Sequence, residues 1–215
     1  MTGSLVERLD LDSLPVVLEA DLDHWAFQQT LLTEVVALDI ETTGLDWRRE
    51  TIGTVQLQVA DATYVVRPGG RVPRLLKAIL EDRAICKLFH HAMFDLRFLA
   101  HHWGVTPANV ACTKISSKLA DPELPRAEHS LAPLLERSLG IRLDKGARTS
   151  DWTGDLSEAQ LRYAANDVRH LTELHWHLEE RLRERGLLEL RNRCYAHLPT
   201  QVELEVGEFP DVFAY

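Results

Sequence analysis

The stretch TEVVALDIETTGL, residues 33–45, decides the fold of this chain. Its β-branched and apolar residues predict a buried strand over 33–41, which ends at the turn-prone TTGLD. Asp39 and Glu41 are two apart on this strand, so both side chains point to one face. Two carboxylates on one face of a central strand repel each other unless a cation lies between them. The alternative is that both acids are solvated at the strand end.

Further elements on either side of this strand predict an α/β fold with a mixed sheet. Apolar alternation and turn signals predict strands at 14–18, 51–60, 60–70 and 84–89. Helical periodicity predicts helices at 21–32, 72–82, 91–104, 112–120, 130–139 and 157–185. Three consecutive strands, a helix, a strand and then a run of helices are typical of an α/β domain.

Composition narrows the class of protein. The 215 residues fit one domain, and no apolar run is long enough to span a bilayer. The three cysteines form no CxxC pair, so we expect reduced thiols in a cytoplasmic protein. The net charge of −9 argues against wrapping long duplexes, although bound metal ions would reverse the field inside a site. A short or single-stranded nucleic acid held at one end suits this charge.

Two helical segments carry further acids. Asp95 lies in AMFDLRFL, off the apolar face that Phe94, Phe98 and Leu99 define. Tyr163 and Asp167 are four apart and share one helix face. Taken singly, Asp95 is an acid favoured near a helix N-terminus, and the Tyr–Asp pair is a common helical hydrogen bond. Together with the strand acids, they suggest a two-metal site for phosphodiester chemistry.

The order of these motifs resembles the Asp-Glu-Asp-Asp superfamily of 3′–5′ exonucleases, in its tyrosine-containing branch. The stretch LDKGARTSDWTGDLSEAQLRYAANDVRHL, residues 143–171, is similar to the ribonuclease D family. NVACTKISSKLA at 109–120 and CYAHLPTQVELEVGEFPDVFAY at 194–215 resemble the compact bacterial enzymes called nano-RNase C. The resemblance implies a ribonuclease H-like mixed sheet flanked by helices.

The resemblance also implies roles for individual residues. Asp39, Glu41, Asp95 and Asp167 would ligate two divalent cations, Mg²⁺ or Mn²⁺. Tyr163 would hold the nucleophilic water. The implied reaction removes nucleotides from the 3′ end of single-stranded RNA or short oligoribonucleotides and releases nucleoside 5′-monophosphates.

Substrate contacts are implied at five more positions. Thr42 would face the terminal nucleotide, and Leu45 would wedge against the terminal bases. His90 follows the Phe-His pattern of ribonuclease D, which favours RNA. Lys145 would contact a phosphate, or else be a solvated surface charge. Trp152 would stack a base or be buried by packing.

The same resemblance also predicts the domain organisation. We expect a single exonuclease domain over 1–215, with a catalytic core at about 34–185 and an aromatic tail at 186–215 that packs or forms an oligomer interface. We expect no additional nucleic-acid-binding domain after this core, which favours short substrates or a homo-oligomer that builds its own channel. Two other functions stay open: a DNA-directed proofreading exonuclease and a non-catalytic nucleic-acid-binding module.

Overall fold

The strand predicted at 33–41 is β2, Val35–Thr42, in the interior of a six-stranded sheet. The structure is a computed structural model that describes residues 13–143 and 151–214. The strand order is β1-β4-β3-β2-β5-β6. The other strands are β1 (Val16–Glu19), β3 (Ile52–Val59), β4 (Ala62–Arg67), β5 (Cys86–Phe89) and β6 (Val110–Cys112).

The sheet is mixed, as the sequence predicted. β2, β3 and β4 form an antiparallel meander, while β5 pairs parallel to β2 and β6 pairs parallel to β5. β1 pairs parallel to β4 at the opposite edge. Every residue of β3 is buried, which fits a strand covered on both faces.

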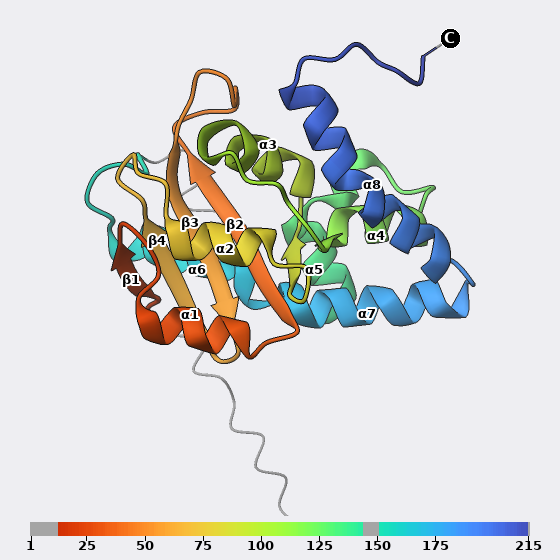
Figure 1. The fold of residues 1–215 in the computed structure, drawn as a ribbon. Coiled ribbons are helices and arrows are strands. Elements are labelled where there is room, and N and C mark those ends of the chain that lie inside the picture. The colour runs from red at the N-terminus through yellow and green to blue at the C-terminus, as the bar shows by residue number, and fades with distance from the viewer. Residues whose placement is uncertain (1–12, 144–150, 215) are drawn as a thin grey trace, which may run out of the picture.

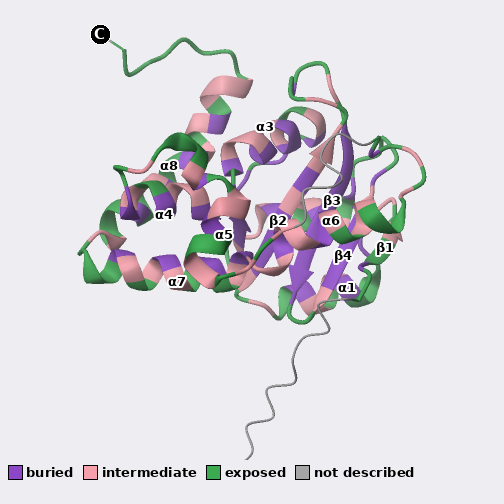
Figure 2. Cartoon of the chain, turned by 180° about the vertical axis from the view of Figure 1, so that it is seen from behind, coloured by how far each residue is buried: buried purple, intermediate pink, exposed green. Residues whose placement is uncertain are grey.

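Helices cover both faces of the sheet. They are α1 (His24–Leu31), α2 (Arg74–Glu81), α3 (Ala92–Trp103), α4 (Thr113–Ala120), α5 (Leu131–Leu139), α6 (Glu158–Arg169), α7 (Leu171–Glu184) and α8 (Leu188–Val206), with a 3₁₀ helix at Arg126–His129. Figure 1 shows α1 and α2 in front of β2–β4 and α6 behind them. Figure 2 shows the buried strands under α6 from the other side. The site described below lies on the face that α6 covers.

Local chemistry explains where several of these helices begin and end. Asp23 caps α1 by accepting a hydrogen bond from the Ala26 amide at 2.7 Å. Asp21 instead accepts from the Leu75 and Leu76 amides of α2 and so ties the two helices together. Gly104 ends α3 in the left-handed conformation at φ 59°, where a side chain would be strained.

The sequence-based prediction differs from the structure in three places, one of which is α8, a helix over Leu188–Val206 where only an aromatic tail was expected. The single helix expected at 157–185 is broken at His170, which has φ −102° and ψ 1° and separates α6 from α7. No proline or glycine marks this break. Strand β6 was not predicted; it has only three residues and depends on parallel pairing with β5. In the tail, Tyr195, Leu198 and Val202 of α8 are buried, whereas Phe209 and Phe213 are exposed.

Candidate active site

Asp39 and Glu41 lie near the carboxyl end of β2 and point to the face covered by α6. Their cross-strand partners on β3 are Gln56 and Thr54. Leu38 and Ile40 face the other way and are buried in the core. A register shift between Glu41 and Thr42 disturbs the ladder where the acids end, a feature common beside active sites.

Asp167 on α6 completes a three-carboxylate cluster with these strand acids. One oxygen from each of Asp39, Glu41 and Asp167 lies within 4.8 Å of the others. Ala164, Ala165 and Val168 form the buried face of α6, and their small side chains allow this helix to approach the sheet closely. The helix begins at a capping box between Ser157 and Gln160, which fixes its start.

Asp95 reaches the same region from α3. Its side chain is buried, and its Oδ1 accepts a hydrogen bond from the Ile40 amide at 3.2 Å. Ile40 lies between Asp39 and Glu41, so this bond joins α3 to the strand that carries the other two acids. The sequence pattern had placed Asp95 off the apolar face of its helix. The backbone of β2 is the polar partner that permits its burial.

Desolvation and mutual repulsion shift the pKa values of two acids in this region. Desolvation of the carboxyl group raises the pKa of Asp39 well above its usual value, and Asp95, Asp167 and Glu41 raise it further. Desolvation also raises the pKa of Asp95, against the hydrogen bond from Ile40 that lowers it. Both groups therefore bind protons more tightly than free carboxyls when no cation is present.

The donor set fits hard divalent cations. The cluster offers only carboxylate oxygens, which Mg²⁺ and Mn²⁺ prefer over nitrogen or sulfur ligands. Gln56, the cross-strand partner of Asp39, is buried, and its Oε1 has no hydrogen-bond partner among residues 13–143 and 151–214. Its Nε2 donates to Thr54 Oγ1 at 2.6 Å, which leaves a buried acceptor beside the acids. The site thus combines excess negative charge with an unsatisfied oxygen.

Tyr163 lies one helical turn before Asp167, as the spacing predicted. Its ring centroid is 6.0 Å from that of Trp152, and the two rings are tilted by 41°. Trp152 is 2% exposed and packs with Val65 and Ala164. Of the two roles left open for Trp152, packing beneath Tyr163 agrees with this burial, whereas a stacked base would need an exposed ring.

Gly53 on β3 makes room for that tryptophan. A Cβ atom at Gly53 would lie 2.6 Å from the Trp152 Cβ and 2.7 Å from its carbonyl oxygen. These distances are shorter than van der Waals contact allows, so only glycine permits the close approach of the two backbones. The segment before α6 is thereby held against the sheet.

His90 occupies a buried position between two polar partners. Its Nδ1 lies 2.9 Å from Thr113 Oγ1 and its Nε2 lies 3.1 Å from the His129 carbonyl oxygen. With both ring nitrogens engaged, His90 braces the segment that precedes α3. No local sequence pattern marks Thr113 or His129, because this contact joins three segments that are distant along the chain.

The remaining predicted contacts lie at the end of β2 or outside the described residues. Thr42 Oγ1 donates to the Gly44 carbonyl oxygen at 2.6 Å and so shapes the loop after β2. Leu45 in this loop is 85% exposed, as a wedge against a nucleic acid would need to be. Lys145 lies in the segment 144–150, which the structure does not describe.

Comparison with protein families adds an independent result to this geometry. The model of a 3′–5′ exonuclease family matches residues 18–183, which include all four acids and Tyr163. The chain belongs to this family. The DNA polymerase I of Aquifex aeolicus is 35% identical over 156 residues, which are 68% of this chain and 24% of that protein. The ribonuclease D of Zymomonas mobilis is 34% identical over 60% of this chain and 34% of its own length. The chain thus spans about a quarter to a third of these two relatives.

Solved structures place this 3′–5′ exonuclease domain within the ribonuclease D and NrnC type. Brucella melitensis NrnC is 35% identical, has a TM-score of 0.85, and is matched over 94% of this chain and 98% of its own. The same Brucella protein has been solved with pGG and with bound Mg²⁺. Escherichia coli RNase D, at 23% identity and a TM-score of 0.78, shares the fold. The resemblance inferred from the sequence is confirmed.

No helix in the two described ranges has the length and apolar character needed to cross a bilayer.

Proposed function

We propose that this protein hydrolyses single-stranded RNA and short oligoribonucleotides from the 3′ end and releases nucleoside 5′-monophosphates. The observation that carries the proposal is the convergence of Asp39, Glu41 and Asp167 within 4.8 Å, with Asp95 bonded to the strand between the first two. A carboxylate cluster of this kind serves the metal-assisted hydrolysis of phosphodiesters. The Brucella NrnC structure with pGG supports short substrates.

The four acids would hold two Mg²⁺ or Mn²⁺ ions. When bound, such ions activate a water molecule and stabilise the charge on the leaving 3′-oxygen. Tyr163 would orient that water toward the phosphorus. The water oxygen joins the phosphorus, the bond from phosphorus to the 3′-oxygen breaks, and a proton passes to that oxygen. The strand keeps a 3′-hydroxyl and is one nucleotide shorter.

The end of β2 would hold the terminal nucleotide. Thr42 would face it through its backbone, and the exposed Leu45 would separate the terminal base from its neighbour. Thr42 is the last residue of β2 and Leu45 lies in the loop after it, so substrate contact and catalysis would meet at one end of this strand.

A denaturing-gel time course with 5′-labelled strands tests the proposal. RNA and DNA from dinucleotides to long oligomers are compared in Mg²⁺, Mn²⁺ or EDTA, with Asp95→Ala as the inactive control. We expect a ladder that shortens from the 3′ end only with metal, and faster cleavage of RNA than of DNA. Binding without release of mononucleotides in Mn²⁺ would instead indicate a non-catalytic binding module.

DNA-directed hydrolysis is the second candidate, because the Aquifex relative is a DNA polymerase I. Discrimination between the two depends on contacts to the 2′-hydroxyl. Faster cleavage of DNA than of RNA of equal length and sequence would favour this candidate.

Removal of the Tyr163 hydroxyl tests the orientation of the water. We expect Tyr163→Phe to lower the initial rate about 10²-fold, a typical effect of losing one positioned hydrogen-bonding group. The phenyl ring keeps the contact with Trp152, so we expect the variant to fold, which thermal unfolding checks. Tyr64→Phe is the matched control, since Tyr64 is buried on β4. Equal rates in both variants would remove the Tyr163 hydroxyl from the mechanism.

A further inference from the structure

A cavity lies at the opposite end of β5 from the acids. Its volume is about 650 Å³, within the range of roughly 300–1,000 Å³ that small-molecule sites occupy. It is lined by the first residues of β5 and β6, by the loop 106–109, and by α7 and α8. Asp39 and Glu41 lie near the carboxyl end of β2, which runs parallel to β5, and Asp95 lies on α3, which follows the carboxyl end of β5. The cavity lies at the amino ends of β5 and β6, so it is separate from the active site.

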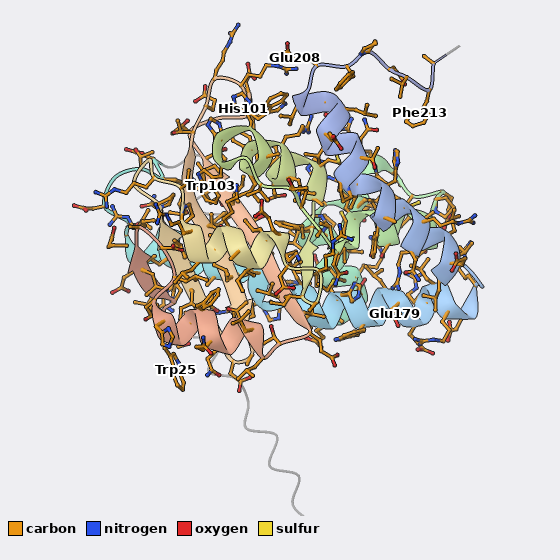
Figure 3. All side chains as sticks on the ribbon, in the orientation of Figure 1. Trp25, His101, Trp103, Glu179, Glu208 and Phe213 are labelled. Carbon is orange, nitrogen blue, oxygen red and sulfur yellow. The ribbon has the colours of Figure 1, made fainter. Side chains whose placement is uncertain are left out.

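The residues that line this cavity carry positive charge, whereas the whole chain is net negative. The protein has a net charge of −9, yet the described residues that line the cavity include Arg83 and Arg191 and no acid. Arg191 is 8% exposed and donates from Nη1 to Glu179 Oε2 at 2.9 Å. Glu179, labelled on α7 in Figure 3, is not among the lining residues, and together with Asn192 Oδ1, which accepts from Nε and Nη2, it holds this guanidinium in place. Arg83 is exposed at the rim.

His175 supplies a buried acceptor in the same wall. It is 5% exposed, lines the cavity, and its Nδ1 has no hydrogen-bond partner in the described part of the chain. Burial lowers the pKa of His175 to about 4, so the ring is neutral at pH 7. Its Nε2 lies 3.9 Å from Glu179 Oε2, which favours the proton on Nε2 and leaves Nδ1 as an acceptor.

Helix α8 contributes Tyr195, Ala196 and Pro199 to the same wall. Pro199 lies inside this helix and lines the cavity. Because proline has no N–H, it cannot donate to the Tyr195 carbonyl four residues earlier. The described lining therefore combines two arginines with one buried acceptor, His175 Nδ1, which is the complement of an anion that also carries an N–H group.

We propose that this cavity binds a small organic anion with N–H donors, and that its ligand is a nucleoside 5′-monophosphate. The phosphate would bind Arg83 and Arg191, and the base would donate to His175 Nδ1. The choice of nucleotide rests on the proposed function, because that reaction releases such molecules. A 5′-monophosphate with an amino-bearing base, such as AMP, supplies both chemical features.

Titration calorimetry with AMP in EDTA tests the proposal without turnover or bound metal. We expect AMP to bind the wild-type chain, and Arg83→Glu and Ala196→Phe each to weaken binding at least tenfold. Arg83→Glu reverses a rim charge, and Ala196→Phe fills the cavity from an exposed position on α8. Arg74→Glu, at an exposed arginine of α2, is the matched control and should bind as the wild type does.

Two simpler anions test which parts of AMP contribute to binding. We expect ribose 5-phosphate and orthophosphate to bind at least tenfold more weakly than AMP, since neither offers an N–H to His175. Equal binding of all three would show a phosphate site without recognition of the base. AMP affinity that is absent, or unchanged in both cavity variants, would overturn the proposal. Because no hydrolysis is measured, these outcomes are independent of whether the chain degrades RNA.

Alkylation of Cys86 gives a site-resolved check. Cys86 lines the cavity and is partly exposed, whereas Cys194 is partly exposed but is not among the lining residues. We expect AMP to slow the alkylation of Cys86 severalfold by mass spectrometry and to leave Cys194 unchanged. Equal protection of both thiols would point to binding elsewhere.

Discussion

Asp39→Asn is expected to slow hydrolysis about 10³-fold while it stabilises the metal-free protein. The substitution removes one carboxylate from the cluster of Asp39, Glu41 and Asp167 and keeps the shape of the side chain. Loss of about 4 kcal/mol of charge stabilisation in the transition state corresponds to a rate about 10³-fold lower. Initial rates with a short 5′-labelled RNA in Mn²⁺ measure this effect.

The same substitution is expected to raise the stability of the metal-free protein, because the acids repel one another without metal. The folded protein raises the pKa of Asp39, so it binds more protons than the unfolded chain between the two pKa values. The wild-type metal-free protein therefore loses stability as pH rises through the folded pKa, and the asparagine variant lacks this loss. In EDTA at pH 8 we expect the variant to melt about 2–4 °C higher, the shift that about 1 kcal/mol produces in a domain of this size.

Asp61→Asn is the matched control for both measurements. Asp61 is exposed in the turn between β3 and β4, so this substitution removes the same charge far from the cluster. It should leave the rate and the melting temperature unchanged. Metal-dependent cleavage by Asp39→Asn at the wild-type rate would remove Asp39 from the site.

Local sequence was sufficient to predict most of the fold. The meander β2–β4, the strand β5 and the helices α1–α5 follow from apolar periodicity and turn residues. These signals do not depend on long-range contact. The break at His170 was missed because residues on both sides continue one helical pattern. Strand β6 was missed because three residues carry too little pattern, and its pairing with β5 is a tertiary contact.

In the candidate site, too, some features were predicted from local sequence and others depend on tertiary contacts. Asp39 with Glu41, and Tyr163 with Asp167, were paired by spacing within one element, and the structure keeps each pair on that element. Asp95 was placed correctly in a helix, but its burial depends on the Ile40 amide, 55 residues away along the chain. His90 and Trp152 were linked to the substrate by family pattern, and tertiary contacts bury both. Spacing thus predicts which groups share a face, but it does not predict which of them reach solvent.

Trp152→Ala is expected to destabilise the protein by about 3–5 kcal/mol, the usual cost of truncating a buried aromatic residue to alanine. Trp152 fills the space between Val65 of β4, Ala164 of α6 and the ring of Tyr163. Its removal leaves a cavity that the close backbone contact at Gly53 prevents from collapsing. Thermal unfolding followed by circular dichroism should show a melting temperature at least about 6 °C lower.

Trp25→Ala is the matched control, because Trp25 on α1 is 68% exposed and points away from the body of the protein in Figure 3. It should shift the melting temperature by no more than about 1–2 °C, as a surface substitution does. The two roles of Trp152 predict different measurements. Packing predicts lost stability together with a lower rate, since Tyr163 and Asp167 share the helix that Trp152 supports. Base stacking predicts unchanged stability and a raised KM, and that result would return Trp152 to the substrate-binding surface.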